Sequence, residues 1–108
     1  MIKIFDVEAG ELRVVLRGHH DLIHDLQWSR NDSYLMSSSA DCSVKIWNLS
    51  SLREASDSYT DKLNYTENDV KYFVTQLLHP SYVYACGFYP DTASENDSRL
   101  IIASVCYD

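Results

Sequence analysis

The stretch GHHDLIHDLQWSRNDSYLMSSSADCSVKIW, residues 18–47, decides the fold of this chain. Apolar residues alternate with polar ones along three short segments of it, and two runs of turn residues, 29–32 and 40–42, separate the segments. Alternation with a period of two predicts half-buried β-strands rather than a helix, and the turn residues predict tight connections between them. The apolar residues of the first segment are Ile23, Leu26 and Trp28.

A Gly-His pair at 18–19 opens this stretch, and Trp47-Asn48 closes it in the place of a Trp-Asp pair. A segment that begins and ends with these two dipeptides resembles the WD repeat, the four-stranded blade of a β-propeller. The resemblance implies that four polar side chains form one buried hydrogen-bonded set, called the tetrad here. Its members would be His19, Ser37, Asp41 and Trp47. An unpaired buried polar group costs about 1–3 kcal/mol, so the four would satisfy one another.

A Ser–His–Asp hydrolase is the alternative interpretation of the same residue types. The sequence has no GxSxG nucleophile elbow to support it. We therefore interpret the set as structural, and we expect no catalytic residue, no bound metal and no cofactor. His20 and His24 are four residues apart, a spacing that suits a metal on a helix but not at the start of a strand.

The flanks of the stretch resemble parts of neighbouring repeats. We expect 1–17 to be the end of a preceding repeat, 18–49 the core repeat, 50–69 a polar insertion, 70–78 the outer strand of the same blade and 79–108 a truncated next repeat. In the last of these, residues 99–104 predict a strand and 106–108 a tight turn.

The resemblance also implies a second, partial tetrad in the last repeat. Its members would be His79, Ser104 and Asp108, with the aromatic position beyond the end of the sequence. The expected fold class is therefore all-β: a partial β-propeller of antiparallel four-stranded blades, one complete and two partial, and a fragment of a longer protein. Strands at the two ends would lack lateral neighbours, which favours association.

Length, charge and cysteine usage narrow the function classes. A propeller needs at least four blades of about 40 residues each, and the chain has 108 residues. A formal net charge of −7 disfavours nucleic acid and anionic membranes as partners. Three cysteines without ligand spacing favour a reducing, cytoplasmic setting. No signal peptide and no membrane-spanning stretch is expected.

The resemblance implies a rigid platform for binding other proteins, whose recognition residues enter one face of the disc. At the corresponding positions we expect partner-contact residues. These are His24, Asp25, Tyr84 and Tyr107. Tyrosine suits such a role because it combines a large rigid surface with a polar tip. Ordinary packing between neighbouring blades is the open alternative.

The runs LLHPSYVYACGFYP (77–90) and SVCYD (104–108) resemble the early repeats of ciliary WD-repeat scaffolds. That resemblance implies a non-catalytic scaffold in cilium assembly, at the basal body and transition zone, with other ciliary proteins as partners. The alternative is a substrate receptor of a cullin-type ubiquitin ligase. Such receptors carry an Arg two residues after the Trp-Asp pair, and here Leu49-Ser50 follows Asn48.

Overall fold

This computed structural model describes residues 1–53, 71–89 and 100–107. The described residues form eight β-strands. They are β1 (Ile2–Asp6), β2 (Glu11–Leu16), β3 (Ile23–Trp28), β4 (Tyr34–Ser39), β5 (Ser43–Asn48), β6 (Phe73–Leu78), β7 (Val83–Phe88) and β8 (Ile102–Cys106). A short 3₁₀ helix, η1 (Ser50–Arg53), follows β5. The predicted all-β class is confirmed.

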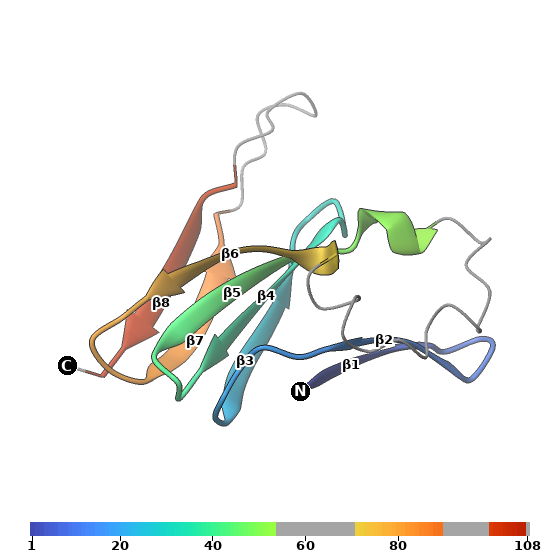
Figure 1. Cartoon of the computed structure of the whole chain (residues 1–108). Coiled ribbons are helices and arrows are strands. Elements are labelled where there is room, and N and C mark those ends of the chain that lie inside the picture. Colours follow the sequence, from blue (N-terminus) through green and yellow to red (C-terminus); the bar gives the residue numbers. More distant parts are fainter. Residues whose placement is uncertain (54–70, 90–99, 108) are drawn as a thin grey trace.

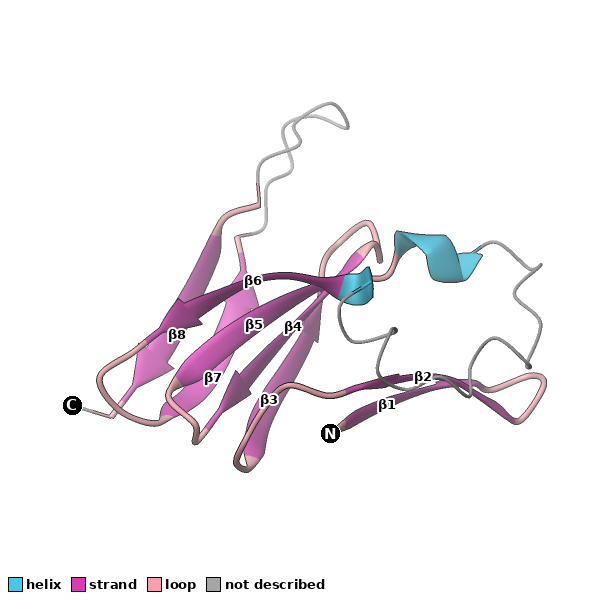
Figure 2. Ribbon diagram, in the orientation of Figure 1, coloured by secondary structure: helices cyan, strands magenta, loops and turns pink. Residues whose placement is uncertain are grey.

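The strands form three antiparallel sheets (Figures 1 and 2). The central sheet has the order β3-β4-β5-β6, so sequential strands are neighbours and short turns connect the first three. A two-stranded sheet, β1-β2, precedes it, and a second one, β7-β8, follows it. One four-stranded unit with two incomplete units beside it is the partial-propeller arrangement expected above.

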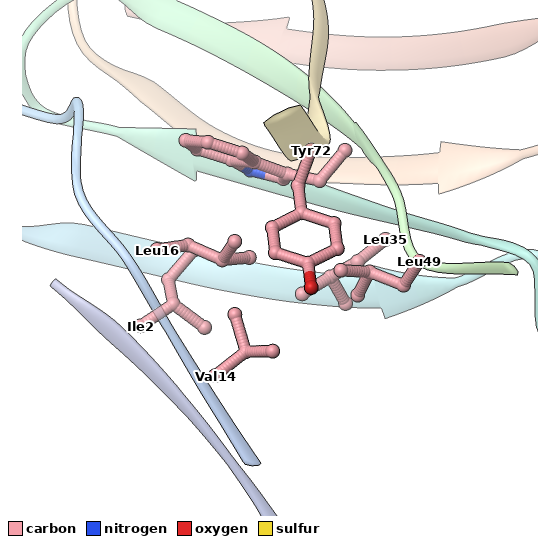
Figure 3. Packing of buried hydrophobic residues seen from close by; sticks show 7 residues of the cluster. Ile2, Val14, Leu16, Leu35, Leu49 and Tyr72 are labelled. Carbon is pink, nitrogen blue, oxygen red and sulfur yellow. The ribbon is translucent and has the colours of Figure 1, made fainter. Parts of the chain in front are cut away.

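Two hydrophobic clusters hold the outer sheets against opposite faces of the central sheet. Cluster 1 joins β1-β2 to one face (Figure 3), and it consists of Ile2, Val14, Leu16, Leu35, Trp47, Leu49 and Tyr72. Cluster 2 joins β7-β8 to the other face, and it consists of Met36, Val44, Ile46, Val83 and Cys86. Successive residues of a strand point to opposite faces, so Leu35 and Met36 belong to different clusters.

The prediction of half-buried central strands is wrong. In β4 every residue from Leu35 to Ser39 is buried, and in β5 every residue from Ser43 to Trp47 is buried. The causes are the further sheet that stacks on each face and the chain before β3, which covers Ser37 and Ser39. The alternation in sequence distributes the side chains between two clusters rather than between core and water.

The first strand of the central sheet, β3, is more exposed than the alternation predicts. Leu26 and Trp28 are 44% and 47% exposed, although an apolar strand residue is expected to face a core. The reason is position, because β3 is an edge strand of the central sheet. Among the described residues, β4 is its lateral partner and β7 packs against it.

Three sequence expectations need correction at their boundaries. The outer strand begins at Phe73 rather than Val70, and the last strand is Ile102–Cys106 rather than 99–104, so Cys106 lies in the strand and not in the turn. The first residues of the expected insertion form η1, whose Leu52 packs against cluster 1. Residues 54–69 lie outside the described part of the chain.

Candidate functional site

The structure brings the four tetrad side chains together from four separate segments. His19 precedes β3, Ser37 lies in β4, Asp41 lies in the β4–β5 turn and Trp47 lies in β5. His19 Nδ1 is 2.8 Å from Asp41 Oδ2, and His19 Nε2 is 2.6 Å from Ser37 Oγ. The Trp47 indole N–H donates to the same Ser37 oxygen at 3.0 Å.

Hydrogen bonding in the tetrad is consistent with one tautomer of His19. An ionised Asp41 accepts only, so Nδ1 carries the proton and donates to it. Nε2 then accepts from the Ser37 hydroxyl, whose oxygen accepts from the indole. Burial lowers the pKa of His19 below its usual 6.5, and this outweighs the opposing effect of the Asp41 carboxylate. The imidazole is therefore neutral at physiological pH.

Asp41 organises the turn between β4 and β5. Burial alone would raise the pKa of its carboxyl, but hydrogen bonds from Ser43, His19 and the His20 backbone hold that pKa well below its usual range. Oδ1 accepts from the Ser43 hydroxyl at 2.6 Å and from the Ser43 amide at 3.0 Å. Oδ2 accepts from the His20 amide at 3.1 Å. These bonds fix the turn in which Cys42 has a positive φ of 71°.

The same geometry argues against nucleophilic chemistry at Ser37. A Ser–His–Asp chain is present, but Ser37 is 0% exposed and its oxygen already accepts the indole N–H. Nucleophilic attack requires that the substrate carbon reach the oxygen. The arrangement links strands β4 and β5 to the chain before β3, and that is a structural task.

The second, partial tetrad is described at two of its three predicted positions. The Ser104 hydroxyl lies 2.8 Å from His79 Nε2. Ser104 is in β8, and His79 follows β6 directly, with its amide donating to the Cys42 carbonyl at 2.8 Å. Asp108 lies outside the described residues.

Three of the four candidate contact residues form a continuous surface, called the aromatic row here: His24, Tyr84 and Tyr107. The ring centroids of His24 and Tyr84 are 5.6 Å apart, and those of Tyr84 and Tyr107 are 6.3 Å apart with an edge-to-face arrangement. Tyr84 is 46% exposed and Tyr107 is 67% exposed. The row runs from β3 of the central sheet across to β7 and to the residue after β8.

Asp25, the fourth candidate, has a different environment. Its Oδ2 accepts from the Cys86 amide of β7 at 3.2 Å, and its Oδ1 accepts from the Leu26 amide at 2.9 Å. The carboxylate therefore joins the central sheet to β7-β8. The structure places it between neighbouring sheets, where packing was the alternative interpretation.

Sequence reasoning missed two features. Lys45 is only 8% exposed: its ammonium donates to Gln76 at 2.8 Å and lies 5.2 Å from the centre of the Phe73 ring. A shallow hollow of about 340 Å³ is lined by Trp28, Asp32, Leu49 and Leu52. The first feature depends on the register of β5 against β6 and the second on η1, and the sequence patterns predict neither.

Residues 10–48 match the family model for the WD domain, G-beta repeat. The chain carries a WD repeat. It is 30% identical to jouberin of Rattus norvegicus and of Mus musculus over 99% of this chain and 8% of jouberin. It is 34% identical to the transcriptional corepressor LEUNIG_HOMOLOG of Arabidopsis thaliana, over 75% of this chain and 9% of the relative.

Striatin-3 of Rattus norvegicus is also 34% identical, over 77% of this WD-repeat chain and 10% of striatin-3. The chain thus spans a small part of the length of each of these relatives. No solved structure matches it. Within the described residues, no helix combines the length and the apolar character needed to cross a membrane.

Proposed function

We propose that this WD-repeat chain is a non-catalytic, jouberin-like module of a protein-interaction scaffold. The aromatic row is the observation that supports this proposal best. It consists of exposed rings on a rigid β-framework, and it continues from one sheet to the next. Large rigid aromatic side chains with polar tips are the residue types that dominate protein interfaces.

The framework beneath the row supports the same proposal. Asp25 bridges the two sheets that carry the row, and the buried face of β7 packs on cluster 2. The strands that carry His24 and Tyr84 are therefore joined before any partner arrives. Binding then costs little conformational entropy, which favours affinity.

The finer part of the proposal concerns the cellular setting. The chain is similar to jouberin along 99% of its own length. On that basis we propose an intracellular scaffold at the ciliary basal body and transition zone, with other ciliary proteins as partners.

The test is site-specific crosslinking in ciliated cells. A photo-crosslinking amino acid replaces Tyr107 in one version of the chain and Tyr89, which is 63% exposed but outside the row, in a control. We expect ciliary proteins to be captured from position 107 and not from position 89. A Tyr84→Ala/Tyr107→Ala double variant should reduce their co-purification by at least about tenfold, as loss of interface hot spots does.

Two results would contradict the proposal. Equal capture from positions 89 and 107 would show that the aromatic row is not the contact surface. Recovery of a cullin and its adaptor without ciliary proteins would favour a ubiquitin-ligase receptor instead.

A further inference from the structure

Strand β6 is the last strand of the four-stranded central sheet, and among the described residues β5 is its lateral partner (Figure 1). It lies inside the sequence, between Tyr72 and His79, so its outer edge does not depend on the first or the last residue of the chain. Such an edge carries backbone N–H and C=O groups that can accept a further strand. Proteins usually protect an edge of this kind with charged side chains or proline.

Strand β2 holds the corresponding place in the preceding sheet, and its edge has this protection. The sequence Ile-Lys-Ile-Phe of 2–5, in β1, matches Val-Lys-Ile-Trp of 44–47, in β5, in residue type at every position. Each pairing with the outer strand has a bulge between the third and fourth of these residues. In β2 the extra residue of the bulge is Arg13, and Arg17 directly follows the strand. Two positively charged residues therefore stand at this edge.

The two corresponding positions of β6 are apolar. Val74 is the extra residue of its bulge, and Leu78 takes the place of Arg17. Val74 is 49% exposed and Leu78 is 73% exposed. The whole strand, Phe-Val-Thr-Gln-Leu-Leu, contains no charged residue and no proline. The edge of β6 thus lacks the charges of β2 and presents exposed apolar side chains instead.

We propose that β6 pairs with β6 of a second copy of this chain, antiparallel about a two-fold axis at Gln76. The two central sheets then join into one continuous sheet. The contact is isologous, since both copies use the same surface, and it is complete with two copies.

The exposed side chains select this register. Residues opposite each other in a sheet share a face, so a symmetric antiparallel pair has its axis at a residue. An axis at Gln76 sets Val74 opposite Leu78 of the second copy, at both ends of the contact, and Thr75 opposite Leu77. An axis at Thr75 would set Val74 opposite Gln76 instead. The first register brings the two most exposed apolar side chains of β6 together and out of water, which favours association.

Charge within the contact does not oppose the pairing. The strand itself is uncharged, and the ammonium of Lys45 on the adjacent strand is enclosed, since Lys45 is 8% exposed and donates to Gln76 at 2.8 Å. A contact of six residues from each copy is small against the roughly 20–30 residues a side of a stable interface. We therefore expect a weak, reversible dimer.

The pairing leaves the aromatic row accessible. The row begins at His24 in β3, and β3 and β6 are the opposite edge strands of the central sheet. A dimer formed through β6 thus carries two aromatic rows. Its existence does not depend on the function proposed for the row, and variants in β6 should leave crosslinking from position 107 unchanged.

Two charge variants and their combination test both the surface and the register. Val74→Glu and Leu78→Lys each place a charge in an uncharged contact, and both residues are exposed, so the fold should persist. In the natural protein at its full length, each single variant should weaken self-association at least about tenfold, because a charge without a partner is taken from water. The double variant should recover most of the lost association, because the introduced carboxylate and ammonium lie opposite each other. Sedimentation velocity over a series of concentrations measures all three.

Matched controls are Val7→Glu and Leu22→Lys, at positions that are 92% and 70% exposed and outside β6. They should associate like the natural protein, and circular dichroism should show the same strand content for all variants.

Three results would overturn the proposal. The natural protein could stay monomeric at every concentration; a loss of co-purifying proteins in the β6 variants would then show that the edge accepts a foreign strand instead. The single variants could associate like the controls, which would place the contact on another surface. The double variant could fail to recover association, which would exclude the axis at Gln76.

Discussion

Ser37 is the residue at which the buried polar chemistry of this molecule converges. Its hydroxyl oxygen contacts both His19 and Trp47, and it is 0% exposed. Each of the three groups would be unsatisfied without the others, and a buried unsatisfied group costs about 1–3 kcal/mol. The tetrad therefore stabilises the fold as a unit. Its contribution to stability depends on the protonation states of His19 and Asp41.

Stability should fall as the pH is lowered. The folded-state pKa of His19 lies below 6.5, so the unfolded chain binds its proton first as the pH falls through 6.5. The free energy of unfolding then decreases by up to about 1.4 kcal/mol per pH unit for this one group. The pKa of Asp41 also lies below its reference of 3.8, which adds a second loss below that pH. Urea unfolding at a series of pH values measures both.

The matched variant is His19→Gln, which removes the first titration and keeps a polar side chain. Its stability should be lower than that of the original chain at pH 7 but should depend less on pH between 6.5 and 5. An unchanged pH dependence would show that another group causes the acid sensitivity.

At the scale of elements, the connection between β2 and β3 controls how the tetrad forms. Gly18 has a φ of 155°, and a Cβ built on it would lie 3.2 Å from Cη2 of Trp47. The backbone conformation favours glycine, and the lack of a side chain leaves room for the indole. The entry into β3 is therefore coupled sterically to β5.

Gly18→Ala should destabilise the fold by about 1–3 kcal/mol, through backbone strain and displacement of Trp47. Gly10→Ala is a reference for a positive φ without a steric contact, since Gly10 has a φ of 67° and nothing within 4 Å of a built Cβ. Chemical denaturation should therefore rank Gly18→Ala above Gly10→Ala in cost. Gly87→Ala, with no contact within 4 Å, should be close to neutral. An equal cost at positions 18 and 10 would contradict the role of the Trp47 contact.

The local sequence predicted strands β4 and β5 well, because turn residues mark their ends. The strands around Ser37 and Trp47 follow from the alternation and the turn residues, and the proximity of His19 to Asp41 is what the resemblance to the WD repeat implies. The burial of Leu35 to Ser39 on both faces could not be predicted, because it depends on segments outside this strand's own pattern. The environment of Lys45 depends on the register of β5 against β6, which places Gln76 opposite it and which the local sequence does not specify.

At the scale of the whole molecule, the central sheet contributes one face to each of the two hydrophobic clusters. Neighbouring residues on β4 contribute to opposite ends of the molecule, since Leu35 packs with β1-β2 and Met36 packs with β7-β8. Stacked units of this kind are stabilised largely by contacts between nearest neighbours. Damage to one cluster should therefore loosen one outer sheet before the other.

Leu35→Ala and Met36→Ala should each cost about 2–5 kcal/mol, because both side chains are buried. Native-state hydrogen exchange should show faster exchange in β1 and β2 for the first variant, and in β7 and β8 for the second. Uniform acceleration in both variants would indicate that the three sheets open as one cooperative unit.

The burial of every residue from Leu35 to Ser39 has a consequence for inherited variation in this chain. On a strand with one solvent-exposed face, every second position tolerates substitution among polar residues with little effect on stability. From Leu35 to Ser39 no codon has that freedom, because each side chain is enclosed on one face or the other. Five consecutive codons thus share one constraint, and a missense change at any of them reaches a packed neighbour.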